Sequence, residues 1–276
     1  MRSVLITGAS TGIGRATALR LDAAGWQVFA GVRRESDAAS LREAGSPLLT
    51  PLSLDVTEAE QVAAAAERID REAEGGLDGL VNNAGVAIPG PLETLAIEDF
   101  RRQIEVNMTG QVAVTQALLP ALRTARGRIV FISSIGGRVA LPLTGAYHAA
   151  KFGIEAVGDV FRQELRPWGI SVSIVEPGSI DTPIWERGER HADELGTPQR
   201  EALYGKAIES YRKVVRETAE RGIAPEKAVK AIEHALSAGR PRTRYLVGFE
   251  AKLLARAKLL IPTPIFDRIV ARQMNL

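Results

Sequence analysis

The chain has 276 residues, of which 45% are hydrophobic and 25% charged, so it is long enough to bury the core of a single α/β domain. Its formal net charge of +2 gives no reason to expect nucleic-acid binding, and the absence of cysteine excludes disulfides and thiolate metal sites. The three histidines are too scattered for a metal site, and no apolar run approaches ~18 residues, the length of a membrane span. A strand follows Met1 almost directly and leaves no room for a signal peptide, so we expect a cytoplasmic protein.

The first predicted element is a short apolar strand at residues 3–7, which runs directly into a glycine turn. The turn is Gly8-Ala9-Ser10-Thr11-Gly12-Ile13-Gly14, and a helical pattern follows at 15–24. Glycines let the backbone bend tightly and approach a pyrophosphate, while the free N–H groups and the positive end of the helix dipole attract its charge. This stretch therefore predicts the first unit of a dinucleotide-binding fold.

The same letters allow a second interpretation. Gly8-Ala9-Ser10-Thr11-Gly12 fits the G-x-S-x-G nucleophile elbow of α/β-hydrolases. In that fold several strands and an oxyanion loop precede the elbow, and an acid and a histidine follow it. Only one strand precedes Ser10 here, so the position in the chain favours dinucleotide binding.

The second predicted strand, at residues 27–32, bears on the choice of cofactor. About twenty residues after the glycine turn, a carboxylate would grip the ribose hydroxyls of NAD. That position holds Val32, followed by Arg33 and Arg34. A guanidinium can pair with a phosphate through two hydrogen bonds, so these residues favour NADP(H), and NAD(H) is the alternative.

The third and fourth strands end in polar or small residues at the predicted carboxyl edge of the sheet. Asp55 ends the third strand, and this edge binds ligands in open parallel sheets, which suggests contact with adenine. Thr57-Glu58-Ala59-Glu60 then fits a capping box at the start of a helix. The fourth strand, at 76–81, ends in Asn82-Asn83-Ala84-Gly85, small residues that would let a ribose lie against the backbone.

A long helix is expected from Ile97 to Arg123, with Asn107 in its middle. Asparagine is a poor helix former, so this residue indicates a local kink or a buried polar task. The next strand, at 128–132, ends in Ser133-Ser134, and a helix beginning near Gly145 follows.

On that helix Tyr147 and Lys151 share one face, one turn apart. A fixed positive charge nearby favours the phenolate, so we expect Lys151 to draw the pKa of Tyr147 toward neutrality. The tyrosine could then act as a general acid or base, and the hydroxyl of Ser134 could hydrogen-bond an oxygen held beside it. A solvated helix face is the alternative for the Tyr147/Lys151 pair.

Two loops near these residues, at 86–89 and 135–143, are mostly apolar, and Arg138 is the one permanent charge in them. After the sixth strand, at 171–175, the regular alternation stops. Amphipathic helical patterns from 184 to 221 then predict a lid over the site. Its apolar anchors include Trp185, Leu203 and Tyr204.

A helix at 225–237 and a last strand at 243–247 are followed by a leucine-rich extension at about 249–276. From Arg240 onward, eight basic residues stand against two acidic ones. Such a basic amphipathic segment packs on its own domain, or makes peripheral contact with a membrane or docks on a partner.

Several of these motifs together resemble the short-chain dehydrogenase/reductase family in order and spacing. They are the glycine turn, Asn82-Asn83-Ala84-Gly85, Ser134, the segment from Tyr147 to Lys151, and Pro177-Gly178. The resemblance covers residues 1 to about 183. It implies a single Rossmann-fold α/β domain over 1–276, a doubly wound seven-stranded parallel sheet with helices on both faces.

By that resemblance Tyr147 would give or take a proton, and Lys151 would lower its pKa and hold the nicotinamide ribose. Ser134 would orient the substrate oxygen, and Asn107 would anchor a water in the proton relay. The residues expected to hold the cofactor are Gly8, Ser10, Ile13, Gly14, Arg33, Asp55, Asn83, Ala84, Gly85, Tyr147, Lys151, Pro177, Gly178, Ile180 and Thr182.

The strand end Val28–Arg33 and the segment Arg244–Gly248 resemble the branch that holds hydroxysteroid and retinol dehydrogenases. With the apolar loops, this predicts an NADP(H)-preferring enzyme that interconverts a secondary alcohol and a ketone on a steroid-, retinoid- or fatty-chain-like substrate. A cofactor-binding regulator without turnover and a reductase of small polar carbonyls are the alternatives. Family members commonly pair through the helices expected here at 97–123 and 147–166, so we expect a homodimer or homotetramer.

Overall fold

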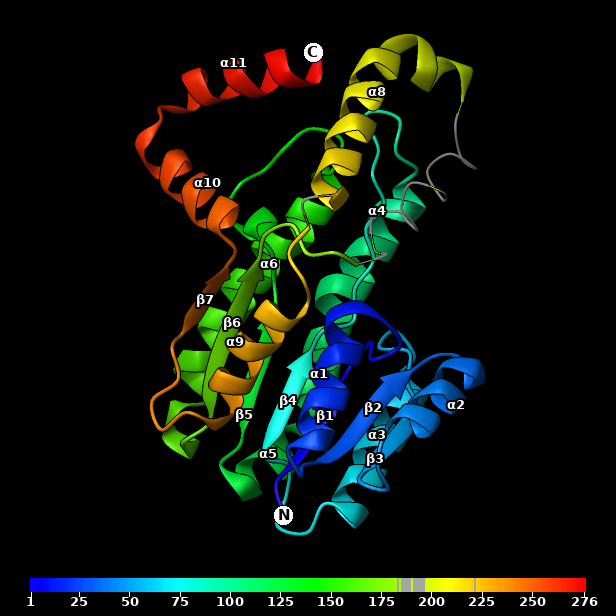
Figure 1. The fold of residues 1–276 in the computed structure, drawn as a ribbon, viewed down its shortest axis with the longest axis vertical. Coiled ribbons are helices and arrows are strands. Elements are labelled where there is room, and N and C mark those ends of the chain that lie inside the picture. The colour runs from blue at the N-terminus through cyan, green and yellow to red at the C-terminus, as the bar shows by residue number, and fades with distance from the viewer. Residues whose placement is uncertain (183, 185–189, 191–196, 221) are drawn as a thin grey trace.

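Seven parallel strands form one sheet at the centre of the computed structural model, which describes residues 1–182, 184, 190, 197–220 and 222–276 (Figure 1). The strands are β1 (Ser3–Ile6), β2 (Gln27–Val32), β3 (Leu49–Ser53), β4 (Gly79–Asn82), β5 (Arg128–Ile132), β6 (Ser171–Pro177) and β7 (Arg244–Val247). Their order across the sheet is β3-β2-β1-β4-β5-β6-β7, so the order reverses between β1 and β4. The expected doubly wound, seven-stranded parallel sheet is confirmed.

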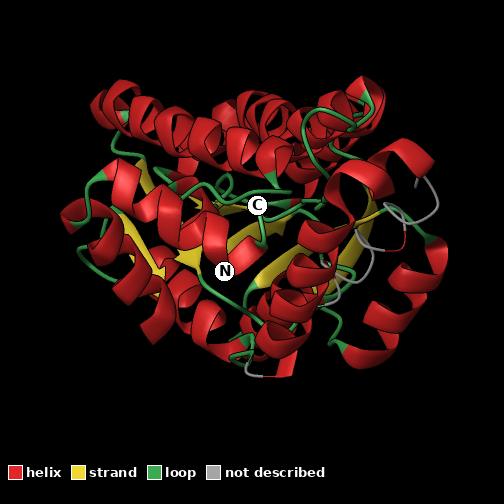
Figure 2. Cartoon of the chain, turned by 90° about the horizontal axis from the view of Figure 1, so that it is seen from above, coloured by secondary structure: helices red, strands yellow, loops and turns green. Residues whose placement is uncertain are grey.

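Helices cover both faces of this sheet, as the view from above shows (Figure 2). The first face carries α1 (Gly12–Ala23), α2 (Glu35–Ala44) and α9 (Glu226–Ser237). The opposite face carries α3 (Ala59–Glu72), α5 (Gly110–Ala125) and α6 (Gly145–Glu164). Each face therefore has its own hydrophobic core between the sheet and a helix layer.

The two cores explain why Val4, Leu5 and Ile6 of β1 are all apolar. Val4 and Ile6 lie in one core and Leu5 lies in the other, and all three are 0% exposed. Successive side chains of a strand point to opposite faces, so a strand covered on both faces is a continuous apolar run. Short apolar runs therefore mark this sheet in the sequence.

The long helix expected from Ile97 to Arg123 is present, and it is irregular in its middle, where Asn107 lies. α4 (Ile97–Ile104) passes into a π-helical turn at Glu105–Thr109 before α5 begins. A Cβ on Gly110 would lie only 2.8 Å from the carbonyl oxygen of Val56, so α5 starts in close contact with the segment after β3. Asn107 lies in the π turn and is 0% exposed, so the poor helix former does mark an irregular turn.

The capping box expected at Thr57–Glu60 does not form. α3 begins at Ala59, and no side chain caps it. Instead, Oδ1 of Asp55 accepts hydrogen bonds from the hydroxyl of Thr57 (2.8 Å) and from its backbone N–H (3.1 Å). The hydroxyl of Thr57 thus bonds within the loop before α3.

Three helices extend beyond the carboxyl ends of the strands: α8 (Pro198–Glu220), α10 (Phe249–Leu260) and α11 (Thr263–Met274) (Figure 1). Ile208 of α8 and Met274 of α11 pack together in one small core. α8 occupies part of the predicted lid, while Trp185 lies outside the described residues. Among the helices in the described part of the chain, none has the length and apolar character needed to span a membrane.

Candidate active site

A buried threonine, Thr7, fixes the glycine turn that follows β1. Its hydroxyl accepts hydrogen bonds from the backbone N–H groups of Asn83 and Ala84, both at 2.9 Å. The side-chain amide of Asn83 donates in return to the carbonyl oxygens of Thr7 (2.9 Å) and Gly8 (3.0 Å). These bonds join the ends of β1 and β4, where the strand order reverses and open α/β sheets bind their ligands.

Glycine is required at two positions of this turn. Gly8 has a φ of +65°, in the left-handed region that favours glycine. A Cβ on Gly14 would lie 2.4 Å from the side-chain nitrogen of Asn83, which leaves no room for a larger residue. The predicted cofactor residues Gly8, Gly14 and Asn83 therefore lie in direct contact.

The start of α1 fits the phosphates of a dinucleotide. Thr11 is its N-cap but makes no side-chain capping bond, and the first turn holds no acidic residue. The first N–H groups of a helix have no partner within the helix, and the positive end of its dipole favours an anion. Ser10 and Ile13 are half-buried on the same turn. The start of α1 thus offers a diphosphate the positive end of the helix dipole and free backbone N–H donors.

The segment after β6 lies beside this turn. Gly178 donates its N–H to the carbonyl oxygen of Val247 at 2.9 Å. Ile180 pairs with Ile223 in a short parallel bridge. A Cβ on Gly12 would lie 3.0 Å from Cγ2 of Thr182, so the end of the predicted cofactor segment 177–182 borders the start of α1.

Arg33 and Asp55 face each other at the ends of β2 and β3. Nη1 of Arg33 lies 3.7 Å from Oδ2 of Asp55, and the side chain of Arg33 is 54% exposed. Val32, the last residue of β2, is buried. Arg33 and Arg34 follow it directly and are exposed. The carboxylate of Glu35 is held by Arg42 at 2.7 Å. The structure therefore places Arg33 and Asp55 together at the expected edge.

Ser134 begins a short 3₁₀ turn after β5, Ile135–Gly137, and its Oγ accepts from the N–H of Gly136 at 3.0 Å. Buried His148 holds the same turn. Its Nδ1 lies 2.8 Å from the carbonyl oxygen of Gly136, and its Nε2 lies 2.9 Å from Oγ1 of Thr144. A carbonyl can only accept, so Nδ1 carries the proton. Burial lowers the pKa of His148, which keeps the ring neutral.

Tyr147 and Lys151 project from α6 toward the end of β5. The hydroxyls of Tyr147 and Ser134 are hydrogen-bonded. Nζ of Lys151 donates to the carbonyl oxygen of Ile132 at 2.7 Å and lies 5.7 Å from the centre of the Tyr147 ring. Tyr147 is 7% exposed and Lys151 is 4% exposed, so the alternative of a solvated helix face is excluded.

The expectation that Lys151 draws the pKa of Tyr147 toward neutrality is wrong for this arrangement. Burial raises the pKa of Tyr147 above its ordinary 10.0, and the hydrogen bond with Ser134 only partly opposes the rise. Burial also lowers the pKa of Lys151 to about 8, partly offset by the negative charge of Glu155 one helical turn further on. Desolvation disfavours the charged form of both groups and outweighs their attraction.

Asn107 holds the segment after β4. Its Oδ1 accepts from the N–H of Val86 and its Nδ2 donates to the carbonyl oxygen of Val86, both at 2.8 Å. A Cβ on Gly85 would lie 3.4 Å from the same Oδ1. Both ends of the amide are engaged with the backbone, and a water bound at Asn107 stays a prediction.

The two apolar loops meet beside the catalytic candidates. Gly90 donates its N–H to the carbonyl oxygen of Leu143 at 2.6 Å. α8 reaches the second loop and the segment that follows the first, because Ile208 packs with Leu143 and the hydroxyl of Tyr204 lies 2.5 Å from Oε2 of Glu93. The predicted lining residue Leu203 is 56% exposed.

Arg138 does not leave a free charge in these loops. Its Nε donates to Oε1 of Glu176 at 2.8 Å, and Glu176 is 0% exposed. The positive charge expected among the apolar loop residues is therefore matched by a buried carboxyl group.

The fold and the turn after β1 define a Rossmann-type dinucleotide-binding protein. A family model described as short chain dehydrogenase matches residues 2–193. The chain belongs to the short-chain dehydrogenase/reductase family. It is therefore an NAD(P)-dependent oxidoreductase that interconverts alcohols and carbonyl compounds.

Two curated relatives match almost the whole chain. Retinol dehydrogenase 5 from Mus musculus is 41% identical over 277 residues, which cover 97% of this chain and 87% of that protein. Human 17-beta-hydroxysteroid dehydrogenase type 6 is 37% identical over 285 residues, which cover 98% of this chain and 87% of that protein. Among solved structures, a short chain dehydrogenase from Burkholderia cenocepacia in complex with NADP is 28% identical, with a TM-score of 0.74 and coverage of 97% of this chain and 98% of that one. The resemblance to the retinol and hydroxysteroid dehydrogenase branch is confirmed.

Three residues that hold the site are missing from the sequence predictions: Thr7, His148 and Glu176. Thr7 directly precedes Gly8, and a hydroxyl between a buried strand and a glycine turn is a readable signal. Glu176 follows the apolar strand Ser171–Val175, where a carboxylate is unexpected unless it is paired. His148 gives no comparable signal, because its partner Gly136 is a backbone carbonyl.

Thr7→Val tests the junction between β1 and β4. Valine keeps the shape of threonine but leaves the N–H groups of Asn83 and Ala84 without their acceptor. We expect the free energy of unfolding to fall by about 1–3 kcal/mol, measured by chemical denaturation, and the affinity for NADPH to fall with it. Thr7→Ser keeps the hydroxyl and should keep the affinity. Parent-like NADPH binding by Thr7→Val would contradict this role.

Proposed function

We propose that the chain is an NADP(H)-preferring dehydrogenase that interconverts a lipophilic secondary alcohol and its ketone. The observation that carries the proposal is the hydrogen bond between half-buried Ser134 and buried Tyr147, with buried Lys151 one helical turn further along the helix of Tyr147. A regulator that only senses the cofactor needs no such pair of hydroxyls beside a buried ammonium. Turnover therefore explains this group of residues better than sensing does.

In this proposal Tyr147 exchanges a proton with the substrate oxygen, which Ser134 also hydrogen-bonds. The raised pKa of Tyr147 keeps the phenol protonated at neutral pH, as a general acid in ketone reduction requires. In alcohol oxidation, the ammonium of Lys151 stabilises the phenolate. This ammonium has three donors, and its bond to Ile132 uses one of them. The bound nicotinamide supplies or accepts the hydride.

Tyr147→Phe tests the proton role. The substitution removes one oxygen, and we expect kcat to fall by about 100-fold or more because general acid–base catalysis is lost. The dissociation constant for NADPH, measured by fluorescence titration, should stay close to that of the parent. Tyr245→Phe, which removes a phenol oxygen on β7, is the control. Parent-like turnover by Tyr147→Phe would remove the catalytic assignment.

The lipophilic substrate is inferred from the residues around the catalytic hydroxyls. Val139 and Leu143 in one loop and Ile88 in the other are apolar, and the charge of Arg138 is paired with Glu176. A site for a sugar or a keto acid needs several converging polar groups, since each group desolvated without a partner costs about 1–3 kcal/mol. The names of the relatives, a retinol and a hydroxysteroid dehydrogenase, support the same inference.

A substrate panel tests this inference. It should contain steroids, all-trans-retinal, long-chain alcohols, sugars and small keto acids, with turnover followed by cofactor absorbance. We expect the highest kcat/KM among the lipophilic compounds. If sugars or keto acids gave the highest values and the lipophilic compounds gave none, the alternative of a polar-carbonyl reductase would replace the proposal.

The preference for NADP(H) is proposed from the end of β2. No carboxylate directly follows Val32, the carboxylate of Glu35 is paired with Arg42, and Arg33 and Arg34 are exposed where a 2′-phosphate would lie. Asp55 shares the charge of Arg33 at 3.7 Å, but an exposed pair at this distance is weak and a phosphate can replace it. Complex formation with NADP by the Burkholderia cenocepacia protein is consistent with this choice.

Arg33→Ala tests the cofactor preference. We expect a selective loss of NADPH affinity, by about 1–3 kcal/mol for a lost charge-assisted contact, with little change for NADH. Arg71→Ala, which removes an exposed charge at the far end of α3, is the control. An equal loss for both cofactors in Arg33→Ala would remove the inference.

We also propose peripheral membrane contact through α10. Phe249, Leu259 and Leu260 are 79%, 82% and 82% exposed, and Lys252 and Arg256 are exposed on the same helix. Apolar and basic side chains together suit an anionic membrane surface. We further propose that the protein assembles as a homodimer or homotetramer. Its proposed location is the cytoplasm.

A further inference from the structure

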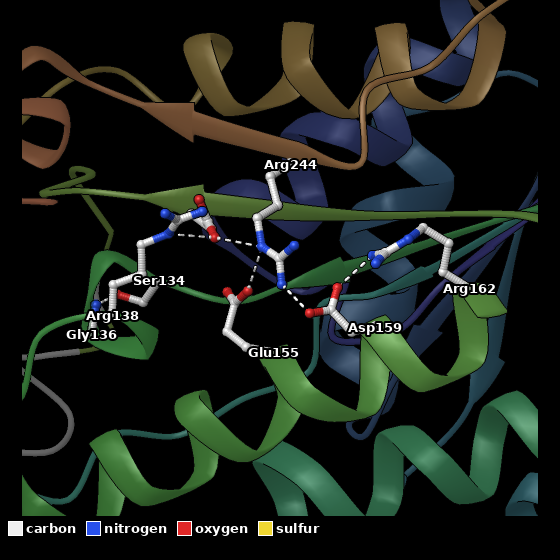
Figure 3. Close-up of polar contacts among 8 residues, drawn as sticks. Ser134, Gly136, Arg138, Glu155, Asp159, Arg162 and Arg244 are labelled. Atoms are coloured by element: carbon white, nitrogen blue, oxygen red, sulfur yellow. Dashed lines mark hydrogen bonds and ion pairs between the residues drawn. The ribbon is translucent and has the colours of Figure 1, made fainter. Parts of the chain in front are cut away.

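A network of ion pairs extends from the residue after the Ser134 turn to α6 (Figure 3). It begins at Arg138, which directly follows the 3₁₀ turn of Ser134 and donates from Nε to Oε1 of Glu176 at 2.8 Å. Glu176 is 0% exposed and precedes Pro177, the last residue of β6. This pair therefore ties the turn that carries Ser134 to the start of the predicted cofactor segment.

Arg244 of β7 extends the network to α6. Its Nε lies 3.4 Å from Oε1 of Glu176 and 3.1 Å from Oε2 of Glu155. Glu155 follows Lys151 by one helical turn, so the same guanidinium contacts both the end of β6 and the helix of Tyr147. The turn, the strand and the helix are thus joined through side-chain charges.

The far end of the network lies away from the catalytic group. Nη2 of Arg244 lies 2.6 Å from Oδ2 of Asp159, which also pairs with Arg162. The side chains of Asp159 and Arg162 are 34% and 29% exposed. Arg162 and Arg138 therefore end the same network on opposite sides, and only Arg138 is next to the Ser134 turn.

The buried end of the network is poorly suited to a purely stabilising role. Burial raises the pKa of Glu176 to about 7, although the hydrogen bond from Arg138 opposes the rise. The cost of desolvating charges often exceeds the attraction between them, and apolar residues of similar volume stabilise as well or better. These charges contribute geometric specificity, because a guanidinium–carboxylate hydrogen bond fixes the relative orientation of both side chains.

We propose that Arg138 and Glu176 are positioning residues, whose ion pair holds the Ser134 hydroxyl in register with Tyr147. Apart from the backbone hydrogen bonds of the turn itself, the bond between His148 and Gly136 restrains the middle of the turn and does not reach Arg138. The inference rests on the reaction of the family and not on the identity of the substrate. Arg138 and Glu176 would then influence the rate without touching the substrate.

The test compares the two ends of the network. Arg138→Met removes the charge at the Ser134 turn with little change in length, and Arg162→Met makes the same change at the far end. Arg138→Lys restores the charge, and Glu176→Gln keeps an acceptor for Arg138 without a negative charge. For each variant, kcat and KM for a 17-ketosteroid with NADPH, the dissociation constant of NADPH, and the melting temperature are measured.

We expect Arg138→Met to lower kcat at least tenfold, since small misplacements of a catalytic group are costly, with less than threefold change in NADPH affinity. Arg138→Lys and Glu176→Gln should fall between this variant and the parent. Arg162→Met should lower the melting temperature but keep kcat within twofold. Equal effects of Arg138→Met and Arg162→Met on kcat, or no effect of either, would overturn the proposal.

A second measurement needs no substrate. Hydrogen exchange of the backbone amides of Gly136 and Gly137 reports how firmly the turn is held. We expect at least tenfold faster exchange in Arg138→Met and parent-like exchange in Arg162→Met. If the parent did not reduce the 17-ketosteroid, that substrate would be excluded while the exchange rates still tested the inference. Parent-like exchange in Arg138→Met would overturn it.

Discussion

The close approach of α6 to the turn after β5 is the constraint on which the site depends. A Cβ on Gly136 would lie 2.9 Å from Nδ1 of His148, and a Cβ on Gly137 would lie 2.9 Å from the carbonyl oxygen of Lys151. Two glycines in succession therefore let the helix lie directly against the turn. The bond from Lys151 to Ile132 then fixes the helix to the end of β5. Only in this arrangement can the hydroxyls of a strand-end serine and a helix tyrosine meet.

The close packing of α6 against the turn removes two ionisable side chains from water, and this desolvation bears on the proton chemistry of the site. Tyr147 and Lys151 are removed from water, and desolvation raises the pKa of one and lowers that of the other. Both shifts favour neutral forms, so a proton is held on the phenol until a substrate oxygen can take it. Charged side chains that can orient the Ser134 turn do not belong to the reacting pair. They form the network of Arg138, Glu176 and Arg244. The site therefore combines a neutral phenol with charged groups around it.

The sheet and the approximate position of the site could be predicted from the sequence because they depend on local patterns. Apolar runs mark strands buried on both faces, and a spacing of four residues on a helix places Tyr147 and Lys151 together. The pKa of Tyr147 could not be predicted, because burial is set by elements far away in the chain. The π turn likewise depends on contact between Gly110 and Val56, and the ion pair of Arg138 joins residues 38 positions apart. The capping box failed for a local reason, since Asp55 takes the hydroxyl of Thr57.

The central claim is that Ser134 and Tyr147 act on one oxygen atom. The most direct measurement is a crystal structure of the protein with NADP⁺ and a lipophilic ketone or a ketone-like inhibitor. The account predicts that the ketone oxygen lies within about 2.5–3.0 Å of both Oγ of Ser134 and the hydroxyl of Tyr147. A ketone oxygen bound to other groups, with these two hydroxyls still bonded to each other, would contradict it.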